Sequence, residues 1–155
     1  KVSANYLNSR LAGLEAKRSG ANAIILNRDG MVSEGPGGCI FLYRDEKLVT
    51  PTINDGILES ITRNTLLTLA ADAGIEVQER RVGRTELHLA SEGFYCGTGQ
   101  ELTPINTIDG KPLSDGKPGP ITRILQSAYD DLVRGRNKKY LHWLTPVWPD
   151  ESREG

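Results

Sequence analysis

The sequence lacks the features that mark several classes of protein. Only two of its 155 residues are cysteine, Cys39 and Cys96, which is too few for a disulfide scaffold. No apolar run approaches the roughly 20 residues that span a membrane, and residues 1–6 contain no apolar targeting segment. We therefore predict a cytoplasmic protein whose two cysteines are reduced and buried as small hydrophobic residues.

An excess of charge of one sign is also lacking. Nineteen Lys and Arg residues against 20 Asp and Glu residues leave a formal net charge of -1, which gives no electrostatic footprint for nucleic acid or for an anionic membrane. No Cys-x-x-Cys occurs, and His88 and His142 lie far apart in the sequence, so the pattern indicates no metal site. The expected partners are therefore neither nucleic acid nor membrane.

What is present is the pattern of one α+β domain. Helices and hairpins are interspersed without regular β-α-β alternation, which argues against a doubly wound parallel sheet. We predict the domain over residues 1–147 and a polar, disordered tail over 148–155. The predicted helices are 5–17, 61–73, 85–90 and 121–134, and the predicted strands are 23–27, 31–34, 39–44, 48–50, 75–82, 93–96 and 105–108.

Two segments resemble places where proteins bind phosphate. Ser60-Ile61-Thr62-Arg63 lies where a loop becomes a helix, so free backbone N–H groups and the positive end of the helix dipole favour an anion there. The glycines of Gly97-Thr98-Gly99 allow a backbone to approach a ligand closely. Each segment has an ordinary alternative, a simple helix cap and a simple turn. The second is not a dinucleotide fingerprint, because a third glycine and a β-α-β unit are lacking.

Three further residues are candidates for the same kind of site. Glu34 precedes the glycine-rich turn 35–38, where its carboxylate either holds a ring nitrogen protonated or remains a solvated turn acid. The Tyr6 phenol either hydrogen-bonds a ligand hydroxyl or packs against the sheet. Lys1 by itself is an ordinary terminal charge. Periodicity and composition do not join these elements into one site.

In this order and spacing the segments resemble the class IV aminotransferases, which are fold type IV pyridoxal-phosphate enzymes. The branched-chain amino-acid aminotransferases are the most similar group, and the segments that carry the resemblance are 1–7, 33–35, 58–63 and 97–104. The resemblance implies a hairpin-rich mixed sheet or pseudobarrel with flanking helices. It also implies a transferase that moves an amino group between a branched-chain amino acid and 2-oxoglutarate by a ping-pong mechanism.

The resemblance further implies a role for each candidate residue. Lys1 would be the catalytic residue, forming a Schiff base with pyridoxal 5'-phosphate and moving a proton during the reaction. Tyr6 would hydrogen-bond the phenolic oxygen of the cofactor, and Glu34 would pair with its pyridinium nitrogen. The remaining expected cofactor-binding residues are Leu58, Ser60, Ile61, Thr62 and Thr98, and the expected substrate-binding turn is Gly97, Thr98 and Gly99.

The chain departs from the family pattern in several places. Pro36 stands where a small residue is usual, Cys39 where asparagine is, and Ser60 where a glycine commonly precedes Ile-Thr-Arg. Family members also carry a small N-terminal domain that this sequence does not contain. We therefore expect a companion segment, as another chain, and the resemblance implies a homodimer with each site near the subunit interface.

Other functions stay open at this stage. A D-amino-acid or (R)-amine transaminase would share the fold, as would an aminodeoxychorismate-lyase-like enzyme. A third alternative is that the isolated chain is an inactive binding or assembly domain. The sequence does not identify the preferred amino acid.

Overall fold

A five-stranded mixed sheet forms the centre of the computed structural model, which describes residues 3–147. The strand order is β3-β2-β1-β4-β5, with β2 and β3 parallel and the other neighbours antiparallel. This arrangement confirms the predicted α+β class. The strands are β1 (Cys39–Arg44), β2 (Lys47–Thr50), β3 (Val77–Glu79), β4 (Glu92–Gly97) and β5 (Glu101–Pro104), with a separate ribbon of β6 (Thr107–Ile108) and β7 (Lys111–Pro112).

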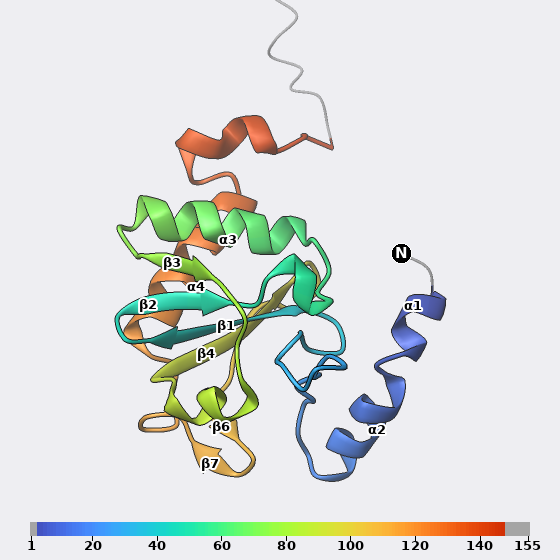
Figure 1. The fold of residues 1–155 in the computed structure, drawn as a ribbon. Coiled ribbons are helices and arrows are strands. Elements are labelled where there is room, and N and C mark those ends of the chain that lie inside the picture. Colours follow the sequence, from blue (N-terminus) through green and yellow to red (C-terminus); the bar gives the residue numbers. More distant parts are fainter. Residues whose placement is uncertain (1–2, 148–155) are drawn as a thin grey trace, which may run out of the picture.

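The helices lie in two groups. The long helices α3 (Ile61–Asp72) and α4 (Pro120–Val133) cover one face of the sheet, whereas α1 (Ser3–Leu7) and α2 (Arg10–Arg18) lie to one side of it (Figure 1). The short 3-10 helices are η1 (Ile53–Asp55), η2 (Arg84–Leu89) and η3 (Lys138–Trp143). Within residues 3–147, no helix is both long enough and apolar enough to cross a membrane.

Both faces of the sheet are buried, which explains why the first four residues of β1, Cys39–Leu42, are all apolar and buried. Cys39 and Phe41 belong to the cluster under α3 and α4, together with Leu66 and Leu125. Ile40 and Leu42 alternate with them and face the opposite cluster, as the two-residue period of a strand requires. Two hydrophobic clusters, one on each face, therefore hold the central strands in place.

Two buried charged side chains fix the long helices to the sheet. Arg63 of α3 is 1% exposed, and its guanidinium donates to the Pro51 carbonyl oxygen at 3.0 Å and to Glu79 at 2.6 Å. Glu92 of β4 accepts from the backbone N–H of Ile121 at 3.1 Å and of Thr122 at 2.7 Å. Glu92 thus caps the N-terminus of α4 from a neighbouring strand, where a negative charge is favoured.

Most of the predicted elements are confirmed, with shifted bounds, and a few predictions are wrong. The predicted helix 5–17 is divided into α1 and α2, because Asn8 and Ser9 lie in a turn between them; such side chains compete for backbone hydrogen bonds. The strand β5 at Glu101–Pro104 was not predicted, and the predicted strand 105–108 contains only the two residues of β6. The helix at 85–90 is a 3-10 helix, and 75–82 shortens to β3.

The strands predicted at 23–27 and 31–34 are present as a paired segment rather than as regular strands. Ile25 donates its N–H to the Glu34 carbonyl oxygen at 2.8 Å, and Ser33 donates to the Ile25 carbonyl oxygen at 2.9 Å. Gly30 occupies the turn with φ of 76°, a conformation that favours glycine. The predicted tail at 148–155 lies outside the described residues.

The cap formed by Glu92 gives the first testable prediction. Glu92→Gln should lower the free energy of unfolding by about 1–3 kcal/mol, because one acceptor oxygen is replaced by an amide donor that faces other donors. Urea unfolding followed by circular dichroism measures the change. Glu101→Gln is the matched control, since this exposed glutamate lies on the adjacent strand β5 and should change the stability by less than about 0.5 kcal/mol. Equal effects of the two changes would contradict the capping role.

Candidate functional site

Predicted site residues from three separate segments meet where β1 begins and β4 ends. Cys39, the first residue of β1, lies opposite Cys96 of β4, one residue before Gly97. The Cys39 thiol donates to the Leu58 carbonyl oxygen at 3.5 Å, which links this end of the sheet to the segment before α3. The turn before β1, the turn after β4 and the start of α3 therefore share one region.

Glu34 is held in this region by the backbone of Leu58. Its Oε2 atom accepts a hydrogen bond from the Leu58 N–H at 3.0 Å and from the Cys39 thiol at 3.9 Å. Burial raises the pKa of the Glu34 carboxyl above its ordinary value, while these two hydrogen bonds oppose the rise. Both of these hydrogen bonds go to the same oxygen, Oε2. Glu34 is thus an oriented carboxylate rather than a freely solvated turn acid.

The two glycine-rich turns lie against each other. A Cβ atom at Gly38 would overlap Nε2 of Gln100 and lie 2.5 Å from the Cys96 carbonyl oxygen, and one at Gly97 would lie 3.2 Å from the Gly37 carbonyl oxygen. Real Cβ atoms essentially never show contacts as close as those at Gly38, and the contact at Gly97 would be tighter than most. The absence of side chains at these two positions therefore lets the turns meet. The turns predicted separately at 35–38 and 97–99 form a single piece of backbone structure.

The N-terminus of α3 has the predicted cap. The Ser60 hydroxyl accepts from the Arg63 N–H at 3.3 Å. This cap uses the N–H of Arg63, so it does not prevent the other N–H groups at the start of the helix from binding a phosphate. Ile61 is 85% exposed and Leu58 63% exposed, whereas the Thr62 side chain is buried. The backbone N–H groups at the start of this 12-residue helix are the kind of donor that binds anions.

The remaining predicted residues are less constrained. Thr98 and Gly99 are exposed on the turn after β4. Tyr6 lies on α1 with 46% of its surface exposed, and α1 lies to one side of the sheet (Figure 1). Lys1 lies outside the described residues. The structure thus brings together Glu34, Leu58, Ser60 and Gly97 with their neighbours, and it does not bring Tyr6 into contact with them.

Tyr95 and Gln100 also support the site, although no pattern in the sequence marks them as site residues. The Tyr95 hydroxyl donates to the Ala23 carbonyl oxygen at 3.1 Å, and its ring occupies the space that a side chain at Gly35 would need. Burial raises the pKa of Tyr95 to about 12, so the hydroxyl keeps its proton at neutral pH. Successive side chains of a strand point to opposite faces of the sheet. Cys96 belongs to the cluster under α3 and α4, so Tyr95 faces the opposite cluster.

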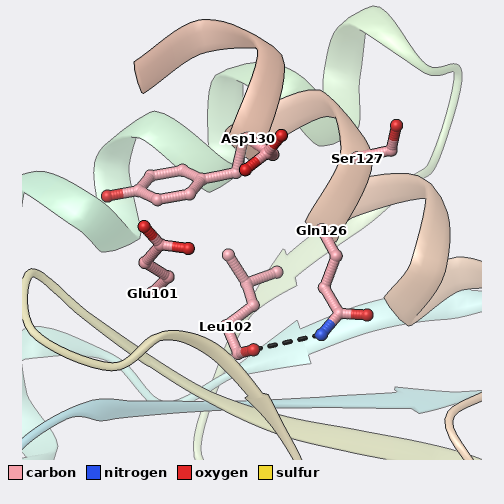
Figure 2. A pocket seen from close by; sticks show the side chains of 6 residues that line it. Glu101, Leu102, Gln126, Ser127 and Asp130 are labelled. Atoms are coloured by element: carbon pink, nitrogen blue, oxygen red, sulfur yellow. Dashed lines mark hydrogen bonds between the residues drawn. The ribbon is translucent and has the colours of Figure 1, made fainter. Parts of the chain in front are cut away.

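The structure also contains a cavity of about 300 Å³ elsewhere, between β5 and α4. Figure 2 shows its lining, with the Gln126 amide bonded to the Leu102 carbonyl oxygen at 3.1 Å. Its two carboxylates, Glu101 and Asp130, already pair with Arg134. None of the predicted residues lines it. Residues 3–147 contain no group of three or more His, Cys, Asp or Glu side chains placed to hold a metal ion.

Comparison with known proteins adds independent information about this region. The family model described as amino-transferase class IV matches residues 1–108. A probable branched-chain-amino-acid aminotransferase from Aquifex aeolicus is 46% identical over 150 residues, which cover 96% of this chain and 48% of that protein. The chain therefore spans about half the length of this curated relative.

Solved structures give the same result at the level of the fold. The branched-chain amino acid aminotransferase from Thermobaculum terrenum in its PLP-form superposes with a TM-score of 0.92 and 52% identity, over 96% of this chain and 49% of that one. The branched-chain aminotransferase from Thermoproteus uzoniensis with norvaline superposes with a TM-score of 0.90 and 46% identity, over 96% and 49%. At identities of 46–52%, the similarity includes the amino-acid sequence as well as the fold.

The contact between the two glycine turns gives the second prediction. Gly38→Ala should destabilise the protein by about 1–3 kcal/mol, because its methyl group forces Gln100 and the Cys96 carbonyl to move. Gly37→Ala is the matched control in the same turn, since a Cβ there meets nothing within 4 Å, and should cost less than about 0.5 kcal/mol. Thermal unfolding of both variants tests this difference. A Gly38→Ala variant as stable as Gly37→Ala would show that the close contact between the two turns does not stabilise the protein.

Proposed function

Because this chain belongs to the class IV aminotransferase family, we propose that its protein transfers amino groups between a branched-chain amino acid and 2-oxoglutarate with pyridoxal 5'-phosphate. The observation that carries the proposal is the convergence of the Glu34 carboxylate, the start of α3 and the turn at Gly97 at one end of the sheet. The names of the relatives support the reaction and the substrate class. The chain spans about half of their length, so the activity belongs to the whole protein.

The residues present fit the cofactor. Pyridoxal phosphate carries a dianionic phosphate and a basic ring nitrogen, which require donors at one place and a carboxylate at another. The N–H groups at the start of α3 and the hydroxyls of Thr62 and Thr98 supply donors without a nearby lysine. Glu34 supplies the carboxylate, with Oε2 anchored by Leu58. This donor set is the reason for preferring the cofactor over a simple anion.

Each residue has a defined task in the proposed mechanism. When bound, pyridoxal phosphate accepts the electron pair released as the Cα–H bond of the substrate breaks. The negative Glu34 carboxylate keeps the adjacent ring nitrogen protonated, which favours that flow of charge. The Lys1 amine, outside the described residues, tethers the cofactor and carries the proton from Cα. The backbone of Gly97, Thr98 and Gly99 holds the substrate carboxylate.

The setting of the site is part of the same proposal. The other half of the relatives' length is proposed to have a counterpart in this protein that contributes substrate contacts. The resemblance supports a homodimer with each site near the interface, and the cysteine content supports a cytoplasmic location. Tyr6 is proposed to meet the phenolic oxygen of the cofactor from α1.

Absorption spectroscopy of the full-length protein tests the function directly. L-Leucine should convert the absorption band of bound pyridoxal phosphate to that of the pyridoxamine form. Conversion by D-alanine or an (R)-amine but not by L-leucine would indicate a D-amino-acid or (R)-amine transaminase instead. Release of pyruvate with return of the original band would indicate a lyase. A protein that shows no cofactor band after reconstitution would overturn the proposal.

Substitution of the tethering lysine gives a sharper prediction. Lys1→Ala should abolish transamination, because both the attachment of the cofactor and the proton carrier are lost. Amino-acid turnover with L-leucine and 2-oxoglutarate measures this. Measurable turnover in the variant would remove Lys1 from the mechanism.

The charge of Glu34 gives a second prediction about catalysis. Glu34→Gln should lower kcat roughly 10²-fold or more, because the neutral amide no longer stabilises the protonated ring nitrogen. The control is Glu59→Gln, an exposed acid beside Leu58, which should leave kcat unchanged. Equal kcat values for the two variants would contradict the role of Glu34.

A further inference from the structure

We propose that Cys39 is a positioning residue for Glu34, its thiol acting with the Leu58 peptide to hold the carboxylate ionised and in one orientation. The inference rests on the proposed function, in which Glu34 faces the ring nitrogen of the cofactor. It adds to that function a residue that acts through Glu34.

The geometry is a closed set of three contacts. Cys39 Sγ lies 3.9 Å from Glu34 Oε2 and 3.5 Å from the Leu58 carbonyl oxygen, and the Leu58 N–H lies 3.0 Å from the same Oε2. The thiol therefore touches both the carboxylate and the peptide that anchors it. Displacement of Glu34 away from this position would break contacts on both sides.

The strand makes Cys39 a rigid support. It is 2% exposed and is fixed by its register with Cys96, which is fully buried. A side chain at the first position of a central strand has little freedom to follow a moving partner. Glu34 itself is only partly buried, so the fixed member of the contact is the thiol.

The second thiol affects the donor state of Cys39. The contact between the two thiols, followed by burial, raises the pKa of Cys96; the same contact lowers the pKa of Cys39, whereas burial and the charge of Glu34 raise it. The protonated Cys39 thiol shares its single proton between the Leu58 carbonyl oxygen at 3.5 Å and Glu34 Oε2 at 3.9 Å. Arg63, buried in α3, is a further charge that acts on both thiols.

The consequence is a change in the charge state of Glu34. Burial raises the pKa of this carboxyl, and the Leu58 N–H and then the Cys39 thiol oppose the rise. A thiol is a weak donor, so its removal should raise the pKa of Glu34 by about 0.5–1 unit. Glu34 pairs with a protonated ring nitrogen only when ionised. As the pH is lowered, the variant should therefore lose affinity for the cofactor at a higher pH than the parent protein does.

The test compares three variants of the full-length protein. Cys39→Ala removes the donor, Cys39→Ser retains a donor at the same place, and Cys96→Ala leaves a similar hole one strand away. Carbon-13 NMR of the glutamate carboxyls, recorded against pH after removal of the cofactor, gives the pKa of Glu34. The affinity for pyridoxal phosphate against pH gives a second reading, and neither requires catalysis.

Cys39→Ala is expected to raise the pKa of Glu34 by about 0.5–1 unit and to shift the affinity profile by the same amount. Cys39→Ser should stay near the parent value, and Cys96→Ala should produce less than half the shift of Cys39→Ala. An unchanged pKa in Cys39→Ala, or an equal shift in Cys96→Ala, would overturn the proposal in favour of simple packing. A parent protein that binds no cofactor would overturn the proposed function instead, and the titration of Glu34 would still decide the role of Cys39.

Discussion

The antiparallel pairing of β1 with β4 is the contact on which the rest of the structure depends. It runs from Cys39 opposite Cys96 to Tyr43 opposite Glu92, and it forms the centre of the sheet. One end of this pair carries the two glycine turns and the start of the site, and the other end carries the carboxylate that caps α4. A shift of one residue in this register would exchange the two buried faces and displace the two glycine turns from each other.

Two of the buried charged side chains, Arg63 and Glu92, support this central pair from opposite sides. Arg63 ties α3 to the edge formed by β2 and β3, while Glu92 ties α4 to β4. Each charge is buried with hydrogen-bond partners, as its desolvation requires. The start of α3 is thereby held at a fixed distance from the sheet, so the donors near Ser60 and the Glu34 carboxylate are oriented before any ligand binds.

The sequence predicted the parts of the structure that depend on local pattern. The limits of β1 were correct because turns flank a continuous apolar run, and α3 was correct because Ser60 and Gly74 mark its ends. β5 was missed because its start at Glu101 follows directly from the turn, with φ of 48° at a non-glycine residue. The contacts of Leu58 with Cys39 and Glu34 could not be predicted, because Leu58 reaches the sheet from a segment distant in sequence.

The interlocked turns at 35–38 and 97–100 also constrain how the site can be altered. Space for a side chain at Gly38 would have to come from Gln100, and space at Gly97 from the backbone at Gly37. A library that randomises only one turn would therefore recover mostly poorly folded members, whatever their selectivity. Productive redesign of substrate range requires paired changes in both loops, or changes confined to the open positions Gly37 and Gly99.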